Sequence, residues 1–414
     1  MGSNSLFMKQ SKLFTKTLKN PPKDEVSINA QLLTQAGFID KLTAGVYTYL
    51  PLGLMVLNKI KRIVREEMNA IDGQEILMPA LHPKEVWQKT GRWTEPGREV
   101  MFQIEGRGGK EYGLGWTHEE IITPLAKKFI SSYRDLPVYL YQIQDKFRNE
   151  PRAKSGLLRG IEFSMKDLYS FHCDEKDLEE YYQKALAAYQ KIFKRCGLAS
   201  LVTEASGGSF SKYSHEFQVL TQYGEDTIYY CRKCGYAQNK EIAEYQAGDK
   251  CPKCGEEMKE GKAIEVGNIF QLKTKYSEPF KLTYTDEAGK IKPVIMGCYG
   301  LGPSRVMGSI VEIYHDDKGL IWPESVAPLK VHLLSLKQND KADIISEELR
   351  KNDLEVLYDE RDVSAGEKFA DADLIGLPYR LVMSGKTGDK IEVKRRDEAK
   401  TQLANLAELV KILS

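Results

Sequence analysis

The stretch Met296-Gly-Cys-Tyr-Gly300-Leu-Gly302-Pro-Ser-Arg305 places three glycines and an arginine directly before an apolar, helix-like segment, Val306 to Ile313. Glycines at this density allow a ligand or another backbone to approach the chain closely. An arginine at a helix start stands at the end that attracts anions. A dinucleotide-binding fingerprint would need glycine in place of Arg305, and no Gly-Lys-Ser/Thr closes a phosphate loop. The pattern alone therefore indicates an anion-binding turn but does not identify the class of binding motif.

A second group of charges lies upstream, in a loop between two strand-like segments. Phe147-Arg148-Asn149-Glu150 opens the loop, Arg159-Gly160-Ile161-Glu162-Phe163 closes it, and Arg152 and Lys154 lie between them. The planar fork of arginine binds carboxylates and phosphates through paired hydrogen bonds. From the residues alone, an exposed hairpin whose arginines pair with its own glutamates is the alternative interpretation.

The composition bounds the class of protein. A chain of 414 residues is long enough for two or three hydrophobic cores. Its 60 Lys and Arg against 59 Asp and Glu give a net charge of +1, so any polyanion must bind to local patches. We find no apolar run near the ~18 residues of a membrane span and no signal peptide, so we expect no membrane partner. The scattered thiols Cys173, Cys196 and Cys298 fit a reducing compartment and predict a cytoplasmic location.

Apolar periodicity predicts the main elements. Amphipathic helices are expected from Gly53 to Ile71 and from Asp177 to Cys196, the second ending at Gly197. A strand stopped by Pro79 should follow the first helix, and Val138 to Ile143 should form another strand. Residues 6–23 carry five lysines and no acid, which predicts a solvated arm or, as the alternative, a phosphate contact.

Beyond Pro323 and Pro328 the pattern changes to alternating strands and helices. This alternation predicts a separate α/β domain with a mostly parallel sheet. The expected elements are strands at 329–336, 354–358 and 379–383 and helices at 340–350, 367–375 and 402–413. Basic residues in its last third could contact RNA; they are Arg380, Lys386, Lys390, Lys394, Arg395, Arg396 and Lys400.

Four cysteines are paired by their spacing, as Cys231-x2-Cys234-x16-Cys251-x2-Cys254. Four thiolates at this spacing are typical of a closed tetrahedral zinc site, which would fold a small ribbon and leave no coordination position for catalysis. The alternative is four reduced cysteines without a metal.

The two charged stretches resemble conserved motifs of one enzyme class. Arg148 with Glu150, followed by Arg159 to Phe163, resembles motif 2 of the class II aminoacyl-tRNA synthetases. Gly300 to Arg305 resembles their motif 3, and the first predicted helix with the strand ending at Pro79 resembles motif 1.

Longer segments are similar to the bacterial-type prolyl-tRNA synthetases, and the resemblance runs from Asn20 to the end of the chain. Three differences stand out: Trp116 precedes the family's T-x-E loop, Pro303 lies inside motif 3, and the loop at 206–213 is longer than usual. The matching segments are Gly115–Glu120, Phe163–His172, Ser214–Leu220 and Gly267–Tyr276.

The resemblance implies an α+β catalytic domain, with an antiparallel sheet and flanking helices, at residues 20–230 and 263–325. It implies an N-terminal arm or tag at residues 1–19 and an α/β anticodon-binding domain at 328–414. The four-cysteine, zinc-ribbon-like insert, 231–262, would replace the large editing domain that many relatives carry. The implied reaction is the ATP-dependent activation of L-proline and its transfer to tRNA(Pro), without editing in cis.

The resemblance also implies roles for individual residues. Arg148 would bridge the α-phosphate of ATP and the proline carboxylate, and Arg305 would hold the γ-phosphate. Phe163 would stack under adenine near Glu150, and Arg159 and Gln218 would complete the ATP contacts. Mg²⁺ would bridge phosphate oxygens beside Glu216 or Gln218.

Proline itself would be bound by a second set of groups. Thr117 and Glu119 match the T-x-E loop that binds the proline nitrogen, and a carboxylate facing a desolvated cation suits that task. His215 matches a histidine that lines the proline pocket, and Arg148 would meet the carboxylate. The family also implies a homodimer, and the missing editing domain implies a separate trans-editing hydrolase.

Three alternatives remain at this point. A synthetase-like protein that lost catalysis would not need Arg148, Glu150 and Arg305. A zinc-ribbon RNA-binding protein leaves the two arginine motifs unexplained. A threonyl-specific enzyme of the same class would need zinc ligands inside the amino-acid pocket, whereas the four cysteines lie elsewhere in the sequence.

Overall fold

The computed structural model describes residues 7–151, 153 and 155–413, and these form two compact units. The larger unit contains Ala44–Val46 and Lys61–Ser309. The other contains residues 7–43, Tyr47–Ile60 and residues from Ile310 onward. Within the described residues, no helix combines the length and apolarity needed to cross a bilayer.

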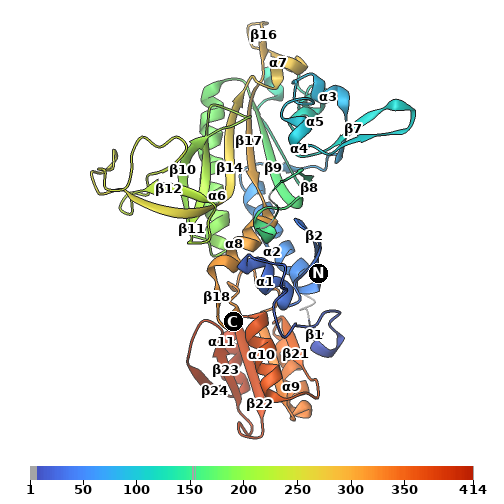
Figure 1. Ribbon diagram of the computed structural model, residues 1–414, viewed down its shortest axis with the longest axis vertical. Helices are drawn as coiled ribbons and strands as arrows, with labels where there is room; N and C mark the ends of the chain where they lie inside the picture. The colour runs from blue at the N-terminus through green and yellow to red at the C-terminus, as the bar shows by residue number, and fades with distance from the viewer. Residues whose placement is uncertain (1–6, 152, 154, 414) are drawn as a thin grey trace. The chain divides into compact units, whose positions relative to one another are not determined.

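A nine-stranded sheet is the framework of the larger unit, with the strand order β11-β10-β13-β12-β14-β17-β9-β8-β4 (Figure 1). The long strand β14 pairs with β12 through its first residues, with β11 along its middle and with β17 on its other edge. The strands are β4 (Gln74–Glu75), β8 (Val138–Phe147), β9 (Glu162–His172), β10 (Ser200–Ser206), β11 (Tyr213–Leu220), β12 (Asp226–Tyr230), β13 (Ala237–Asn239), β14 (Lys259–Lys273) and β17 (Ile295–Leu301). The pairs β8–β9, β9–β17, β17–β14 and β14–β11 are antiparallel, as the resemblance implies.

Helix α6 (Glu175–Arg195) covers one face of this sheet (Figure 1). The Asp174 side chain accepts a hydrogen bond from the Asp177 backbone N–H at the helix start, and Gly197 adopts a positive φ just after the end. The apolar residues that recur along the helix are buried against β9, β14 and β17. The predicted helix is confirmed, but it begins two residues earlier and ends one residue earlier than predicted.

Helix α2 (Pro51–Asn69) confirms the first predicted helix, but the strand expected to end at Pro79 is shorter. Only Gln74 and Glu75 form the strand that pairs with β8, and the last backbone bond of this pairing runs from the Ile76 N–H to the Tyr141 carbonyl at 2.8 Å. The Gln142 and Gln144 side chains bond the Met78 backbone instead, at 3.0 and 2.8 Å. The larger unit also holds α3 (Lys84–Gln88), α4 (Gly97–Val100), α5 (Glu119–Ala126), α7 (Ser277–Phe280), β5 (Leu81–Pro83), β6 (Gln103–Glu105), β7 (Glu111–Leu114), β15 (Thr283–Thr285) and β16 (Ile291–Pro293). Helix α8 (Pro303–Ile313) belongs to it as far as Ser309.

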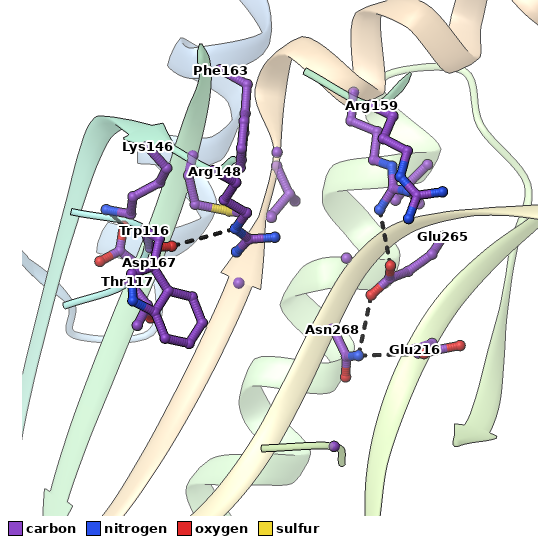
Figure 2. Close-up of a pocket in the computed structure, with 18 of the residues that line it drawn as sticks. Trp116, Thr117, Lys146, Arg148, Arg159, Phe163, Asp167, Glu216, Glu265 and Asn268 are labelled. Atoms are coloured by element: carbon purple, nitrogen blue, oxygen red, sulfur yellow. Dashed lines mark hydrogen bonds and ion pairs between the residues drawn. The ribbon is translucent and has the colours of Figure 1, made fainter. Parts of the chain in front are cut away.

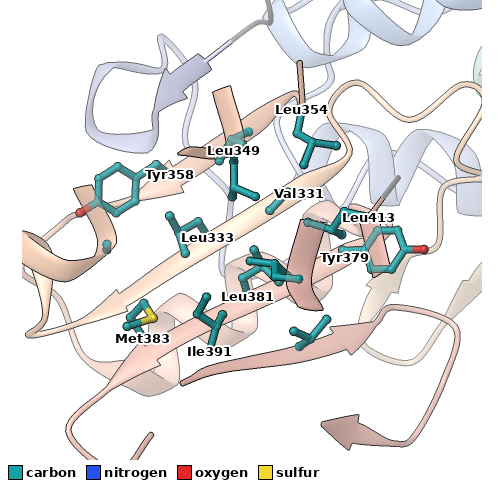
Figure 3. Packing of buried hydrophobic residues seen from close by; sticks show 14 of the residues in the cluster. Val331, Leu333, Leu349, Leu354, Tyr358, Tyr379, Leu381, Met383, Ile391 and Leu413 are labelled. Atoms are coloured by element: carbon teal, nitrogen blue, oxygen red, sulfur yellow. The ribbon is translucent and has the colours of Figure 1, made fainter. Parts of the chain in front are cut away.

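The other unit is built on a six-stranded sheet with the order β1-β21-β20-β22-β23-β24. Its inner strands are almost wholly apolar because helices cover them, and Figure 3 shows Leu333, Leu381 and Leu349 packed in the core between strand and helix. The sheet and its helices comprise β1 (Phe7–Lys9), β20 (Val331–Leu336), α9 (Asn339–Lys351), β21 (Val356–Asp359), α10 (Ala365–Ile375), β22 (Tyr379–Ser384), β23 (Ile391–Arg395), β24 (Thr401–Ala404) and α11 (Leu406–Leu413). Shorter elements of this unit are α1 (Ile28–Gln35), β2 (Ile39–Thr43), β3 (Val46–Tyr49), β18 (His315–Asp316) and β19 (Gly319–Leu320).

Two sequence predictions for this unit are wrong. The last helix starts at Leu406 rather than Gln402, because the Asn405 side chain accepts from the Glu408 N–H at 3.0 Å while the Glu408 carboxylate accepts from the Asn405 N–H at 2.9 Å. The preceding residues form an antiparallel hairpin with β23. The N-terminal segment is not simply a solvated arm, since Phe7–Lys9 pairs in parallel with β21.

The predicted basic strip is only partly available for an RNA partner. Arg380 pairs with Asp373 at 2.6 Å, Arg395 pairs with Asp397 at 3.1 Å, and Arg396 is buried against Asp316 at 2.6 Å. Lys386 and Lys390 are exposed in the turn between β22 and β23. The cations that remain for a polyanion are therefore mainly lysines.

Candidate functional site

One cavity of about 1100 Å³ in the larger unit collects most of the residues that the sequence singled out. Its walls come from β8, β9, β11, β14 and β17 and from the loops that join them (Figure 2). The predicted residues that line it are Thr117, Glu119, Arg148, Glu150, Arg159, Phe163, Glu216 and Arg305. Two stretches more than one hundred residues apart thus meet, as the resemblance to motifs 2 and 3 requires.

Arg148 follows the end of β8 and is half-buried. Its backbone N–H donates to the Ile161 carbonyl at 2.8 Å, its Nε donates to the Trp116 carbonyl at 3.4 Å, and its guanidinium lies 5.1 Å from the Phe163 ring centre (Figure 2). Among the residues that the structure describes, no carboxylate lies within ion-pair distance of it. Loss of hydration lowers the pKa of Arg148, yet an arginine stays protonated at any physiological pH. The cavity therefore presents a cation that makes no direct ion pair with the described part of the chain.

Arg305 lies in the first turn of α8, and its Nη1 is 2.9 Å from the Glu265 carboxylate on β14. Pro303 is the first residue of that helix, where a missing N–H costs nothing, so this difference from the family leaves the motif intact. Gly300 and Gly302 line the cavity, and a Cβ added at either would meet no atom closer than 3.3 Å. A Cβ would fit within the chain at Gly300 but would press on the Arg305 side chain at Gly302, and both glycines leave space in the cavity in front of them.

The predicted alternative of an ion-paired hairpin is partly realised in the loop after β8. Arg159 lies 3.1 Å from Glu150 and 3.3 Å from Glu225, and all three line the cavity. Arg152 and Lys154 lie outside the described residues. The ion pairs hold the loop over the cavity and do not remove it from the site.

Thr117 and Glu119 form the opposite end of the cavity. The Thr117 hydroxyl donates to Glu119 Oε2 at 2.6 Å, and the Cys298 thiol donates to Oε1 at 3.3 Å. Glu119 is fully buried in the first turn of α5, where the helix dipole favours a negative charge. Cys298 is thus a buried hydrogen-bond donor of this pocket.

Arg92 neutralises this acidic end, and sequence reasoning missed it. Its Nη1 lies 3.5 Å from Glu119 and 3.0 Å from Glu120. Burial opposes the positive charge, but the two carboxylates and Tyr276 outweigh it and raise the pKa of Arg92. Four aromatic rings enclose the guanidinium, those of Trp87, Trp116, Phe210 and Tyr276. Trp116, which also differs from the family's pattern, therefore helps to hold this cation.

Two further charged groups near the site also went unrecognised. Lys146 and Asp167 lie 2.7 Å apart on neighbouring strands and line the cavity near Thr117 (Figure 2). Burial opposes ionisation of Asp167, yet Lys146 outweighs it and lowers the pKa of the carboxyl. Glu265, the partner of Arg305, had no local signal, because its role depends on a residue forty positions away.

Glu216 lies on the far side of the cavity from Arg148, among neutral amides (Figure 2). Gln218 Nε2 and Asn239 Nδ2 donate to its Oε2 at 2.9 and 3.0 Å, and Asn268 Nδ2 is 3.5 Å from its Oε1. Burial, with Glu265 nearby, raises the pKa of Glu216 to about 7. Gln218 is fully buried and does not line the cavity, but it also donates to Asp226 at 2.8 Å. The prediction that Gln218 contacts ATP directly is therefore corrected. Its amide donates hydrogen bonds to the carboxylates of Glu216 and Asp226.

The structure does not bring His215 into the cavity. Side chains alternate along β11, so His215 leaves the sheet on the face opposite to Glu216. Its Nδ1 lies 2.8 Å from the Tyr182 hydroxyl of α6, and burial lowers its pKa. The prediction that His215 lines the proline pocket is corrected to a structural contact with the covering helix.

The four cysteines converge as their spacing predicts. All four Sγ atoms lie within 4.8 Å of one another, and neighbouring pairs are 3.4 and 3.5 Å apart. Each Cys-x2-Cys segment turns the same way: Gly235 N–H donates to the Cys231 carbonyl at 3.0 Å and Gly255 N–H to the Cys251 carbonyl at 2.8 Å, both glycines having positive φ. Such a donor set suits tetrahedral zinc.

The comparisons with known proteins agree with this geometry. The family described as "tRNA synthetase class II core domain (G, H, P, S and T)" matches residues 102–314, and "Anticodon binding domain" matches 325–414. The chain is 36% identical to the proline–tRNA ligase of Sulfurihydrogenibium sp., over 96% of this chain and 98% of that one. It is 40% identical to the proline–tRNA ligase of Wolbachia sp., over 97% and 99% of the two chains.

The chain belongs to the class II prolyl-tRNA synthetases. A crystal structure of the prolyl-tRNA synthetase from Cryptosporidium parvum, complexed with L-proline and AMP, shares the fold with a TM-score of 0.75 and 18% identity, over 93% of this chain and 74% of that one. Enzymes of this class use ATP as a substrate.

The lengths of the alignments show how this prolyl-tRNA synthetase differs from many of its relatives. The alignment with the Sulfurihydrogenibium enzyme spans 552 positions, far more than the 414 residues of this chain, whereas that with the Wolbachia enzyme spans 419. The first relative thus carries a long stretch with no counterpart here, and the second does not. The short four-cysteine segment stands in a chain that lacks a large insertion.

The Arg92 cluster gives a prediction. Arg92→Met leaves two buried carboxylates without their cation and should lower the free energy of unfolding of the catalytic unit by about 3–5 kcal/mol, measured by urea denaturation. Arg134→Met, at an exposed arginine of the same unit, is the control and should change it by less than about 0.5 kcal/mol. Equal stability of the two variants would show that Arg92 does not neutralise the pocket.

Proposed function

We propose that the cavity binds ATP and L-proline side by side, forms prolyl-adenylate, and then transfers the prolyl group to the 3′ end of tRNA(Pro). Family membership supports the reaction. The observation that carries the site assignment is the unpaired guanidinium of Arg148, which stands between the Thr117–Glu119 end and the Arg305 end of one cavity. A reaction of this kind needs alignment and charge neutralisation more than a covalent nucleophile.

In this proposal Arg148 binds the proline carboxylate and the α-phosphate together, holding the attacking oxygen against phosphorus. Arg305 binds the γ-phosphate of a folded nucleotide and exchanges its Glu265 partner for it. Phe163 stacks with adenine, and Glu150 and Arg159 contact the base and phosphates at the loop. Gly300 and Gly302 leave room for the nucleotide.

Glu119 and Thr117 bind the secondary ammonium of proline. The carboxylate is buried and fixed by three donors, the Thr117 hydroxyl, the Cys298 thiol and Arg92, so it does not have to reorganise when the cation arrives. Trp116 and Phe210 line the same end and offer an apolar surface to the pyrrolidine ring.

Mg²⁺ fits the acidic side of the cavity. Glu216 lies near Glu265 and Asp226, with amide donors and no described cation within ion-pair distance, and oxygen ligands are those that Mg²⁺ prefers. The ion would neutralise charge on the phosphates. Glu216 is the ligand we propose, with Gln218 behind it.

Amino-acid-dependent ATP–pyrophosphate exchange tests the function and the role of Arg148. We expect exchange with proline and little with other amino acids. Arg148→Ala should reduce the rate by about 100-fold or more, the usual cost of losing one preorganised donor to transition-state charge. Arg107→Ala, an exposed arginine of the same unit, is the control and should retain the full rate. Normal exchange in Arg148→Ala would remove the proposed role.

We also propose that the four cysteines bind a structural zinc ion. Cys251→Ser should abolish stoichiometric zinc, measured by metal analysis, and make residues 231–262 sensitive to protease, because the insert has only a small apolar core. Much exchange activity should survive at saturating Mg²⁺. Cys196→Ser, at a buried thiol elsewhere, should keep zinc; zinc retained in Cys251→Ser would contradict the site.

The absence of a large insertion leads us to propose that this enzyme does not edit in cis. Supplied with alanyl-tRNA(Pro), it should not hydrolyse the ester faster than the buffer does, whereas a separate trans-editing hydrolase would. Measurement of the deacylation rate checks this. Rapid clearance by the purified enzyme would contradict the proposal.

The remaining assignments complete the proposal. The catalytic domain spans 20–230 and 263–325, the zinc insert 231–262, and the anticodon-binding domain 328–414, where exposed lysines face tRNA(Pro). We propose a cytoplasmic homodimer; sedimentation equilibrium measures the mass, and a monomer at micromolar concentration would contradict it.

A further inference from the structure

The insert that carries the four cysteines reaches into the catalytic cavity through one side chain. Asn239 is the last residue of β13, three residues after Tyr236, whose carbonyl accepts the Cys231 N–H at 2.8 Å and closes the first cysteine turn. Its Nδ2 donates to Glu216 Oε2 at 3.0 Å. Asn239 is 7% exposed, and Glu216 lines the cavity. A segment outside the catalytic strands thus holds a carboxylate inside the site.

The pairing of β13 within the sheet explains why Asn239, and not Gln238, contacts Glu216. Strand β13 pairs with β12 on one side, where Ile228 lies opposite Asn239, and with β10 on the other, where Glu204 lies opposite Gln238. Consecutive side chains leave a strand on opposite faces. Gln238 therefore donates to Glu204 at 3.0 Å on the face of His215, and Asn239 points to the face of Glu216.

Glu216 needs such support because no described cation lies within ion-pair distance of its carboxylate. The described residues within reach of its carboxylate are the amides of Gln218, Asn239 and Asn268, and the nearby charges on Glu265 and Asp226 repel it. A carboxylate without a cationic partner keeps one orientation only if neutral donors hold it. Gln218 and Asn239 share Oε2, which leaves Oε1 directed toward Asn268 and the cavity wall of β14.

We propose that Asn239 is a positioning residue of proline activation: the zinc ribbon holds Glu216 through Asn239 in the orientation that receives Mg²⁺ on the ATP phosphates. The inference rests on the proposed function and deepens it, because it makes the insert a part of the activation site. Zinc then shapes the β12–β13 hairpin, and the hairpin places the amide.

The test is the Mg²⁺ dependence of proline-dependent ATP–pyrophosphate exchange. In Asn239→Ala the Mg²⁺ concentration for half-maximal rate should rise about tenfold, because a hydrogen bond to a charged group is lost. The KM for proline should stay unchanged, since Thr117 and Glu119 lie at the other end of the cavity. Zinc content measured on the same sample shows that the ribbon is folded.

Gln238→Ala is the matched control, because it removes a buried amide–carboxylate bond from the same strand on the opposite face. It should leave the Mg²⁺ requirement as in the wild type. Asn239→Ser, which keeps a short donor, should fall between the alanine variant and the wild type. If Asn239→Ala loses its zinc, the Mg²⁺ requirement of Asn239→Ser tests the inference instead.

A double-mutant cycle identifies the route of the effect. In a Glu216→Gln background, Asn239→Ala should add no further change to the Mg²⁺ requirement. An unchanged requirement in Asn239→Ala and Asn239→Ser, an equal shift in Gln238→Ala, or additive effects with Glu216→Gln would each overturn the inference. Absence of proline-dependent exchange in the wild type would instead overturn the proposed function.

Discussion

No described carboxylate lies within ion-pair distance of the Arg148 guanidinium, and the catalytic unit is organised around that fact. Other described cations at or beside the cavity are paired: Arg305 with Glu265, Arg92 with Glu119 and Glu120, and Lys146 with Asp167. A desolvated cation is costly unless it is paired. The cavity thus favours an anionic substrate at one defined point, with the Trp116 carbonyl and the Phe163 ring keeping the cation in place.

The insert shows how a small segment can be integrated into such a site. Its strand β13 pairs with β12, which precedes the first cysteine, and β12 pairs with β14, so the insert joins the catalytic sheet and does not form a free-standing lobe. Because β14 also carries Glu265 and Asn268, the same strand links the cysteine ribbon to the partner of Arg305. A chain that lacks a large insertion thus still connects the cysteine segment to the catalytic cavity through β14.

Local signals predicted much of this architecture. Helix α6 has a capping aspartate, a regular apolar stripe and a terminal glycine, so its bounds could be read from the sequence. The cysteine spacing predicted that the four thiols converge, and the resemblance to motifs 2 and 3 predicted that Arg148 and Arg305 lie in one cavity. His215 was misplaced although the alternation of a strand already sets it opposite Glu216.

The sequence does not predict side-chain pairings that depend on tertiary contacts between distant segments. Arg92 has no local feature that marks it; its importance comes from four rings and two carboxylates gathered from distant segments. Residues 402–404 of β24 are predicted as the start of the last helix because β24 leads almost directly into α11, and the reciprocal Asn405–Glu408 bonds fix where that helix begins.

The most direct measurement of the central claim is a crystal structure with proline and a non-hydrolysable ATP analogue bound together. The account predicts one nucleotide folded back between the two arginines, with Arg148 touching both the α-phosphate and the proline carboxylate and Arg305 released from Glu265 onto the γ-phosphate. A nucleotide bound elsewhere, or Arg148 turned away from both ligands, would contradict it.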